Sequence, residues 1–94
     1  MIRLLPLLLL ALALAAPSSA STLADARARG RLLCGVNPGL QGFAAQTADG
    51  SWAGFDADFC KAVAAAALGD AAAVDYVPVN AQERFDKLKT GAVD

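Results

Sequence analysis

The sequence has no histidine, and this absence removes several kinds of chemistry from consideration. A nucleophile cannot be activated by histidine, and Cys34 and Cys60 lack the further ligands of a zinc site. The chain also has no glycine-rich phosphate-binding or dinucleotide-binding motif. Eight basic residues against nine acidic ones give a net charge of −1, which argues against nucleic acid as a partner. The residues alone therefore predict no catalytic constellation, no metal and no cofactor.

The one long apolar run of the chain lies at its N-terminus. Residues 1–3 carry a positive charge, residues 4–14 are apolar except for a proline, and Ser18-Ser19-Ala20 are small. This is the three-part layout of a secretory signal peptide, and we expect cleavage near Ala20. The run is shorter than the about 20 residues that a membrane span requires, so an anchor or a buried helix is the weaker alternative. We expect residues 1–20 to be the signal peptide and residues 21–94 to form one domain at most.

The rest of the chain alternates between strand and helix patterns. Turn residues, helix caps and apolar spacing predict the following elements: a helix at 23–29, a strand at 31–36, hairpin strands at 43–46 and 51–53, a helix at 56–68, a strand at 74–79, a helix at 81–90 and the start of a strand at 92–94. This order is that of β–α–β units, which imply a parallel α/β sheet.

The same patterns predict which residues are buried and where helices begin. The strand at 31–36 lacks alternation, so we expect both of its faces to be buried. Helical spacing predicts these apolar residues as buried helix faces: Phe59, Cys60, Val63, Ala64 and Ala67 in one helix, and Phe85 and Leu88 in the other. The predicted N-terminal caps of the three helices are Thr22, Asp56 and Asn80.

Two pairs of residues have both a functional and a structural interpretation. Asp56 and Asp58 resemble a metal or acid–base pair, but residues two apart diverge on a helix, and both charges favour its N-terminus. Cys34 and Cys60 lie on a strand and on the first turn of the helix expected to pack on it. A disulfide is favoured for an even pair in an exported protein, with two buried thiols as the alternative.

Three further regions are candidate ligand contacts. Residues 37–43 follow the carboxyl end of a strand, where open α/β sheets bind ligands, although an ordinary Gly/Pro turn explains them equally well. Trp52 either covers a hydrophobic edge or faces a cleft. Arg84 lies among charged residues typical of a solvated helix face, but its place in the first turn leaves a ligand role open.

Beyond these physical patterns, several segments resemble a known protein family. They are Gly30-Arg31-Leu32-Leu33-Cys34-Gly35-Val36-Asn37-Pro38-Gly39, Gly50-Ser51-Trp52-Ala53-Gly54-Phe55-Asp56-Ala57-Asp58-Phe59-Cys60, Val77-Pro78-Val79, Arg84-Phe85-Asp86-Lys87-Leu88 and Gly91-Ala92-Val93-Asp94. Together they resemble the polar amino-acid-binding periplasmic proteins of ABC transporters (extracellular solute-binding proteins, family 3). The general L-amino-acid-binding subgroup is the most similar, because it has cysteines at positions matching Cys34 and Cys60.

The resemblance implies a type II periplasmic-binding-protein-like fold with two α/β lobes that close on an amino acid. Residues 21–94 would be the incomplete first part of lobe 1. Matching positions make Asn37, Leu40 and Arg84 pocket-lining, with Trp52 as a further candidate contact. Many relatives have an aromatic residue in place of Leu40. In the family, a Thr-x-Thr-x-x-Arg-like segment that follows the position of Asp94 binds the ligand carboxylate, and an acid of the second lobe binds the amino group.

The implied function is periplasmic capture of L-amino acids for an ABC importer, with the amino acid and the membrane permease as partners. The alternatives are an exported enzyme on the same scaffold, similar to cyclohexadienyl dehydratases or lytic transglycosylases, and the sensor domain of a membrane receptor. The matching cysteines and Arg84 favour the binding protein, so we expect no enzyme activity.

Overall fold

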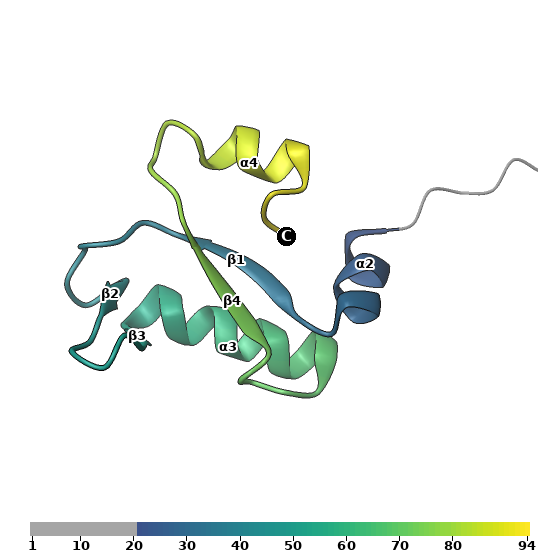
Figure 1. Cartoon of the computed structure of the whole chain (residues 1–94), viewed down its shortest axis with the longest axis horizontal. Helices are drawn as coiled ribbons and strands as arrows, with labels where there is room; N and C mark the ends of the chain where they lie inside the picture. The colour runs from purple at the N-terminus through teal and green to yellow at the C-terminus, as the bar shows by residue number, and fades with distance from the viewer. Residues whose placement is uncertain (1–20) are drawn as a thin grey trace, which may run out of the picture.

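The computed structural model describes residues 21–94, so the predicted signal peptide at 1–20 lies outside the described residues. The elements, in chain order, are α2 (Thr22–Arg29), β1 (Leu32–Val36), β2 (Ala45–Gln46), β3 (Trp52–Ala53), α3 (Phe55–Leu68), β4 (Val74–Pro78) and α4 (Arg84–Thr90) (Figure 1). All elements expected between residues 23 and 90 are present, with bounds shifted by a few residues. Within residues 21–94, no helix combines the length and the apolar character needed to cross a bilayer.

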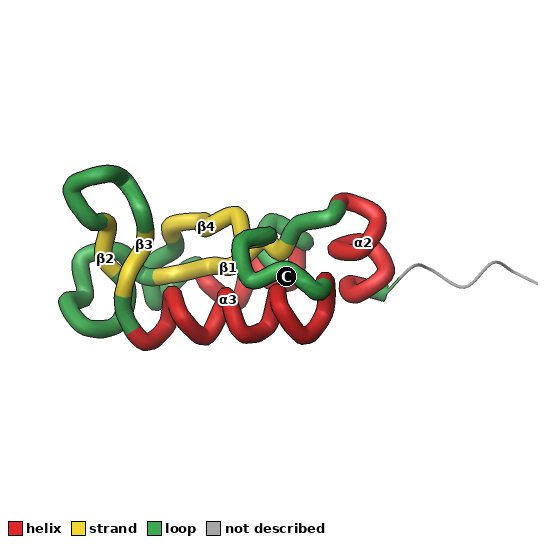
Figure 2. The backbone as a smooth tube through the Cα atoms, turned by 90° about the horizontal axis from the view of Figure 1, so that it is seen from below, coloured by secondary structure: helices red, strands yellow, loops and turns green. Residues whose placement is uncertain are grey.

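Strands β1 and β4 form a parallel pair that is connected through α3. Leu32 lies opposite Val74 and Val36 opposite Pro78, while β2 and β3 form a separate antiparallel hairpin. Helix α3 lies along one face of the β1–β4 pair, and α4 lies on the other side of the pair in the view of Figure 1 (Figures 1 and 2). The predicted α/β fold with a parallel β–α–β unit is confirmed.

The hydrophobic core lies between α3 and the face of the sheet that α3 covers. Its buried members are Leu32, Val36, Ala44, Cys60, Ala64 and Val74, and Cys34, Trp52, Leu68 and Tyr76 pack around them. Ala57 and Ala64 have no exposed surface, so small side chains bring the helix backbone close to the strands. The described residues contain no large side chain that is fully buried. Close approach of backbones, and not the volume of apolar side chains, therefore characterises this core.

Several predictions of burial were wrong. Phe59 is 63% exposed, because the face of α3 that contacts the sheet runs through Ala57, Cys60 and Ala64 and leaves Phe59 beside it. Phe85 and Leu88 are also mostly exposed on α4. Strand β1 is well covered only on the face toward α3, since Leu33 is half-buried and Gly35 is exposed.

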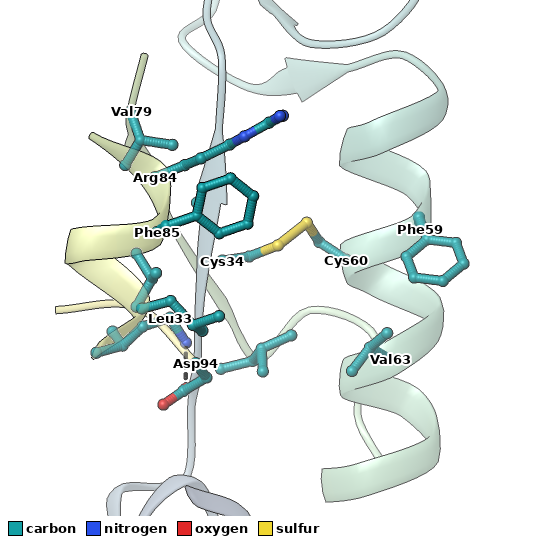
Figure 3. Close-up of a pocket in the computed structure, with 13 residues that line it drawn as sticks. Leu33, Cys34, Phe59, Cys60, Val63, Val79, Arg84, Phe85 and Asp94 are labelled. Carbon is teal, nitrogen blue, oxygen red and sulfur yellow. Dashed lines mark hydrogen bonds between the residues drawn. A yellow bond between two sulfur atoms is a disulfide. The ribbon is translucent and has the colours of Figure 1, made fainter. Parts of the chain in front are cut away.

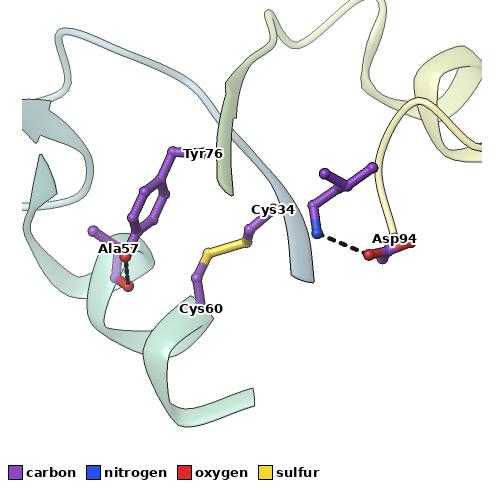
Figure 4. The surroundings of a disulfide bond; sticks show 6 residues. Cys34, Ala57, Cys60, Tyr76 and Asp94 are labelled. Atoms are coloured by element: carbon purple, nitrogen blue, oxygen red, sulfur yellow. Dashed lines mark hydrogen bonds between the residues drawn. A yellow bond between two sulfur atoms is a disulfide. The ribbon is translucent and has the colours of Figure 1, made fainter. Parts of the chain in front are cut away.

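A disulfide joins Cys34 of β1 to Cys60 of α3, as the sequence favoured (Figure 4). The two Cα atoms are 6.1 Å apart. The hydroxyl of Tyr76 on β4 donates a hydrogen bond of 2.9 Å to the carbonyl oxygen of Ala57 on α3. Helix α3 is thus connected to both strands of the sheet, by a covalent bond to one and a hydrogen bond to the other.

The helix caps differ in part from the predictions. Ser21, not Thr22, caps α2, because the Ser21 hydroxyl accepts from the backbone amide of Ala24 at 3.1 Å. Asp56 lies inside the first turn of α3, whose N-cap is Gly54 and has no side-chain cap. The prediction for Asn80 holds for the turn before α4 only: its side-chain oxygen accepts from the backbone amides of Gln82 and Glu83 at 3.0 and 2.8 Å, whereas the N-cap residue of α4 is Glu83, without a side-chain cap.

Residues 92–94 do not form a strand, but Asp94 takes a strand-like position. On the β4 side, the amide of Leu32 donates to the carbonyl of Ala73, and the carbonyl of Val36 accepts from the amide of Val79. Leu33 uses the other edge: its carbonyl accepts from the Asp94 amide at 2.8 Å, and its amide donates to the Asp94 carboxylate at 2.8 Å (Figure 4). Asp94 thus occupies the second edge of β1, where a further strand was predicted to begin.

We predict that removing the disulfide strongly destabilises the fold. Replacing Cys34 and Cys60 together by serine opens a loop with a sequence separation of 26. Loop-closure entropy gives an expected loss of about 3–4 kcal/mol in the free energy of unfolding. Urea unfolding of the double variant, compared with the oxidised protein, measures this loss. A change below about 1 kcal/mol would show that the packing of α3 on the sheet suffices without the bond.

Candidate ligand-binding site

The edge of the sheet at which β1 and β4 end contains a small pocket with polar walls. Its volume is about 140 Å³, and it is lined by Gly35, Asn37, Asp56, Val79, Asn80, Ala81 and Arg84. We call it the polar pocket. The residues come from the ends of both strands and from the first turns of α3 and α4. In open α/β sheets this carboxyl edge is where ligands bind.

The loop after β1 is held against the start of α3 by backbone hydrogen bonds. The carbonyl of Gly42 accepts from the amide of Phe55 at 2.9 Å, and the carbonyl of Phe43 accepts from the amide of Asp56 at 2.9 Å. These carbonyls satisfy helix amides that a side-chain cap would otherwise take. The side chain of Asp56 is therefore not needed as a cap, and Asp56 is one of the residues that line the polar pocket.

Gly54 makes this contact possible. Its φ of +119° is a conformation that other residues rarely adopt, and a Cβ atom there would overlap the carbonyl group of Phe43. The Gly-Phe-Asp segment thus needs its glycine because two backbones meet at this point.

Two reciprocal hydrogen bonds, arranged as in a capping box, fix the turn that leads into α4 and Arg84. Asn80 accepts from the amide of Glu83 at 2.8 Å, and the Glu83 carboxylate accepts from the amide of Asn80 at 3.1 Å. Arg84 follows immediately, with its guanidinium carbon 5.1 Å from the centre of the Phe85 ring. In Figure 3, the Arg84 side chain extends from α4 toward α3.

The polar pocket is lined by one acidic and one basic residue, Asp56 and Arg84, that do not form an ion pair with each other. The three ion pairs found within residues 21–94 are Arg29–Asp94, Arg31–Asp75 and Lys61–Asp58. Asp56 and Arg84 take part in none of these ion pairs, although both residues line the pocket. The lining of the pocket therefore includes one acidic, one basic and one amide residue, Asp56, Arg84 and Asn37.

The structure brings together two of the four predicted ligand contacts. Asn37 and Arg84 both line the polar pocket. Leu40 is 47% exposed on the loop after β1, where it pairs with Ala44. The ring of Trp52 stacks on Tyr76 with a centroid distance of 5.7 Å, at the margin of the core.

Asp56 is the pocket residue that sequence reasoning assigned to another role. Its place in the first turn after a turn glycine is typical of a cap, and this local pattern concealed its position in the pocket. The sequence feature that could have shown this is Gly54. At this glycine the backbone of Phe43 comes close enough to cap the helix, so a side-chain cap is not required.

A larger apolar groove, of about 370 Å³, adjoins the polar pocket. Its lining includes the following side chains (Figure 3): Leu33, Phe59, Val63, Phe85, Leu88, Val93 and the Cys34–Cys60 disulfide. The groove lies between α3 and α4, and Arg84 lines both it and the polar pocket. The sequence predicted Phe59, Phe85 and Leu88 to be buried. They are mostly exposed because they line this open groove.

Two side chains outside the polar pocket have shifted pKa values. Hydrogen bonds from the Thr47 hydroxyl and the Ser51 amide lower the pKa of Asp49 in the exposed hairpin from 3.8 to about 2. Burial raises the pKa of the Tyr76 hydroxyl above its ordinary 10.0. Tyr76 therefore keeps its proton at neutral pH and remains the donor to Ala57.

We predict that Gly54→Ala is more destabilising than an ordinary glycine substitution. The alanine would adopt an unfavourable φ and would also overlap the Phe43 carbonyl, so we expect a loss of about 2–3 kcal/mol. Gly50→Ala is the matched control, because its φ is also positive, at +84°, but nothing lies within 4 Å of the added atom. Its expected cost is about 1–2 kcal/mol in urea unfolding. Equal losses in the two variants would contradict the backbone contact.

The chain was compared with known proteins. The family model of bacterial extracellular solute-binding proteins, family 3, matches residues 32–94. The chain is 58% identical over 77 residues to the general L-amino acid-binding periplasmic protein of Rhizobium johnstonii. It is equally identical, over the same length, to a glutamate/glutamine/aspartate/asparagine-binding protein of Rhodobacter capsulatus. Each match covers 82% of this chain but 23% of the relative, so the chain spans less than a quarter of these proteins.

The chain is also similar to parts of solved structures. A periplasmic binding protein of an ABC transporter from Brucella ovis, with glutathione bound, is 53% identical with a TM-score of 0.76. The match covers 81% of this chain and 24% of that one. An ancestral cyclohexadienyl dehydratase is 30% identical with a TM-score of 0.68, over 82% of this chain and 31% of that one.

The residues that the family model matches, 32–94, contain the Cys34–Cys60 disulfide, the parallel β1–β4 pair and the lining of the polar pocket. The chain belongs to the bacterial extracellular solute-binding proteins of family 3.

Proposed function

We propose that this protein captures L-amino acids in the periplasm and delivers them to an ABC importer. The observation that carries the proposal is the polar pocket, where Asn37 and Arg84 meet at the carboxyl edge of a parallel sheet. A guanidinium group is suited to a ligand carboxylate, because it offers several donors in a fixed plane. The two curated relatives named above are amino-acid-binding proteins, which supports the same chemistry here.

The four candidate contacts take different roles in this proposal. Arg84 and Asn37 line the pocket and donate hydrogen bonds to polar groups of the ligand. Leu40, exposed on the loop after β1, provides an apolar contact above the pocket. Trp52 is half-buried and stacks on Tyr76, so its contribution would be to hold the hairpin and the loop in place.

The domain organisation follows from the same proposal. Residues 1–20 direct export and are removed near Ala20, and residues 21–94 form the first part of lobe 1 of a two-lobed binding protein. Localisation is periplasmic, the partners are a free L-amino acid and the membrane permease of the importer, and no cofactor is involved. The apolar run at 4–14 and the match to extracellular binding proteins support this arrangement.

An exported enzyme on the same scaffold is the second candidate, favoured by the likeness to an ancestral cyclohexadienyl dehydratase. The titratable groups that line the polar pocket are the Asp56 carboxylate and the Arg84 guanidinium. A dehydratase needs a general acid for the leaving hydroxyl, and in this pocket only Asp56 would be available for that role. The two curated relatives named above are binding proteins, so we prefer the binding function.

We predict that Arg84→Ala weakens amino-acid binding about 10- to 100-fold, the loss expected for a charge-assisted hydrogen bond. Calorimetry is performed on the complete gene product, including any residues that its reading frame encodes after Asp94. Lys89→Ala is the matched control, because Lys89 is an exposed cation on the same helix that lines neither the polar pocket nor the apolar groove.

Two outcomes would contradict this proposal. Unchanged affinity in Arg84→Ala would remove Arg84 from the binding site. Conversion of prephenate-like substrates by the unaltered protein, without measurable amino-acid binding, would favour the enzyme.

A further inference from the structure

The two connections between α3 and the sheet both lie in the half of the helix that begins at the polar pocket. Cys60, bonded to Cys34 of β1, and Ala57, whose carbonyl accepts from the Tyr76 hydroxyl at 2.9 Å, belong to the first two turns of α3 (Figure 4). The helix continues beyond them for a further eight residues, 61–68. The disulfide and the hydrogen bond therefore fix the position of the pocket end of α3 in particular.

Both connections are adjacent to residues that line the polar pocket. Gly35 directly follows Cys34 in β1, and Asp56 lies four residues before Cys60, on the same face of α3. Asp56 also directly precedes Ala57, which carries the hydrogen bond to β4. The disulfide thus joins β1 to α3 one residue away from one wall of the pocket and one helical turn away from the other.

Side-chain packing among the described residues does not fix the distance between these two walls. A further hollow, of about 350 Å³, lies between the end of β1 and the first turns of α3. Its lining consists of residues from these two elements: Cys34, Gly35, Val36, Phe55, Asp56, Phe59 and Cys60. The two phenylalanines are more than half exposed and do not fill the space. Within residues 21–94, the disulfide is the covalent connection across this gap.

We infer that Cys34, Cys60 and Tyr76 are positioning residues for ligand binding, because they hold the start of α3 at a defined distance from the end of β1. The affinity for the ligand, and not only the stability of the fold, then depends on the oxidised disulfide. A preformed pocket binds more tightly than a flexible one, since its walls need not be ordered when the ligand binds. This inference deepens the proposed function and rests on it. It does not depend on which further residues contact the ligand.

The test measures affinity separately from stability, in the complete gene product. Calorimetry with L-glutamate and with L-glutamine compares the oxidised protein with the variant in which serine replaces both Cys34 and Cys60. The temperature is one at which circular dichroism shows both proteins to be folded. We expect the double variant to bind about fivefold to tenfold more weakly, the effect of ordering about one further side chain on binding. Tyr76→Phe removes only the hydrogen bond to Ala57, and we expect a smaller loss of about twofold to threefold.

Val74→Ala is the matched control for a loss of stability. Val74 is a buried core residue that lies opposite Leu32, at the end of the β1–β4 pair away from the polar pocket. The substitution leaves a cavity and lowers the free energy of unfolding, but it keeps the disulfide and the Tyr76 hydrogen bond. We expect its affinity for both amino acids to equal that of the unaltered protein.

The outcomes separate this inference from the proposed function. Unchanged affinity in the double variant, or an equal loss in the double variant and in Val74→Ala, would overturn the inference and leave the proposed function intact. If the double variant does not fold, Tyr76→Phe decides in its place, and unchanged affinity there would overturn the inference. If the unaltered protein binds neither amino acid, the proposed function fails and this inference fails with it.

Discussion

The arrangement of this domain depends on the close contact between α3 and the β1–β4 pair. Alanines at positions 57 and 64 leave no exposed surface on the helix face that meets the strands. Close packing at this distance gives each contact its full dispersion energy, but it also demands accurate alignment of the elements. The Cys34–Cys60 disulfide and the hydrogen bond from Tyr76 to Ala57 provide this alignment at two points of the helix. The covalent bond is important here because the core of the described residues contains no large, fully buried side chain.

The polar pocket is a consequence of that contact. Once α3 is fixed on the sheet, its first turn lies beside the end of β1, and the carbonyls of the following loop can cap the helix. The backbone caps the helix in place of a side chain, so Asp56 is not required as a cap, and it lines the pocket. The glycine at 54 permits the backbone contact, and the helix therefore begins without a side-chain cap two residues before Asp56.

The helices were predicted well from the sequence because the residues that begin and end them lie close by in the chain. Gly30, Gly69 and Gly91 end the three helices in the left-handed conformation, and Asn80 with Glu83 forms a capping box that spacing alone indicates. The disulfide could be anticipated because both cysteines were placed on elements expected to pack together.

Tertiary position was harder to predict from the sequence. Phe59 and Val63 have the helical spacing of a buried face, yet the contact with the sheet selects the smaller residues beside them. The cap of α3 comes from residues 42 and 43, which are twelve or more positions earlier in the chain. A pattern of neighbouring residues contains no information about such a partner. The pocket residues Asn37 and Arg84 were proposed from family likeness, and it is the parallel pairing of β1 with β4 that places them at one edge.

Arg84 lines both the polar pocket and the apolar groove, so it relates side-chain packing to the proposed binding site. It lines the apolar groove as well as the polar pocket, and its guanidinium carbon lies 5.1 Å from the centre of the Phe85 ring. Long cationic side chains commonly place their aliphatic stem on apolar surface while the charged head stays in a polar environment. The position of the guanidinium therefore depends on the packing of Phe85 in the groove as well as on charge. Packing in the apolar groove and the geometry of the polar pocket are for this reason coupled through a single side chain.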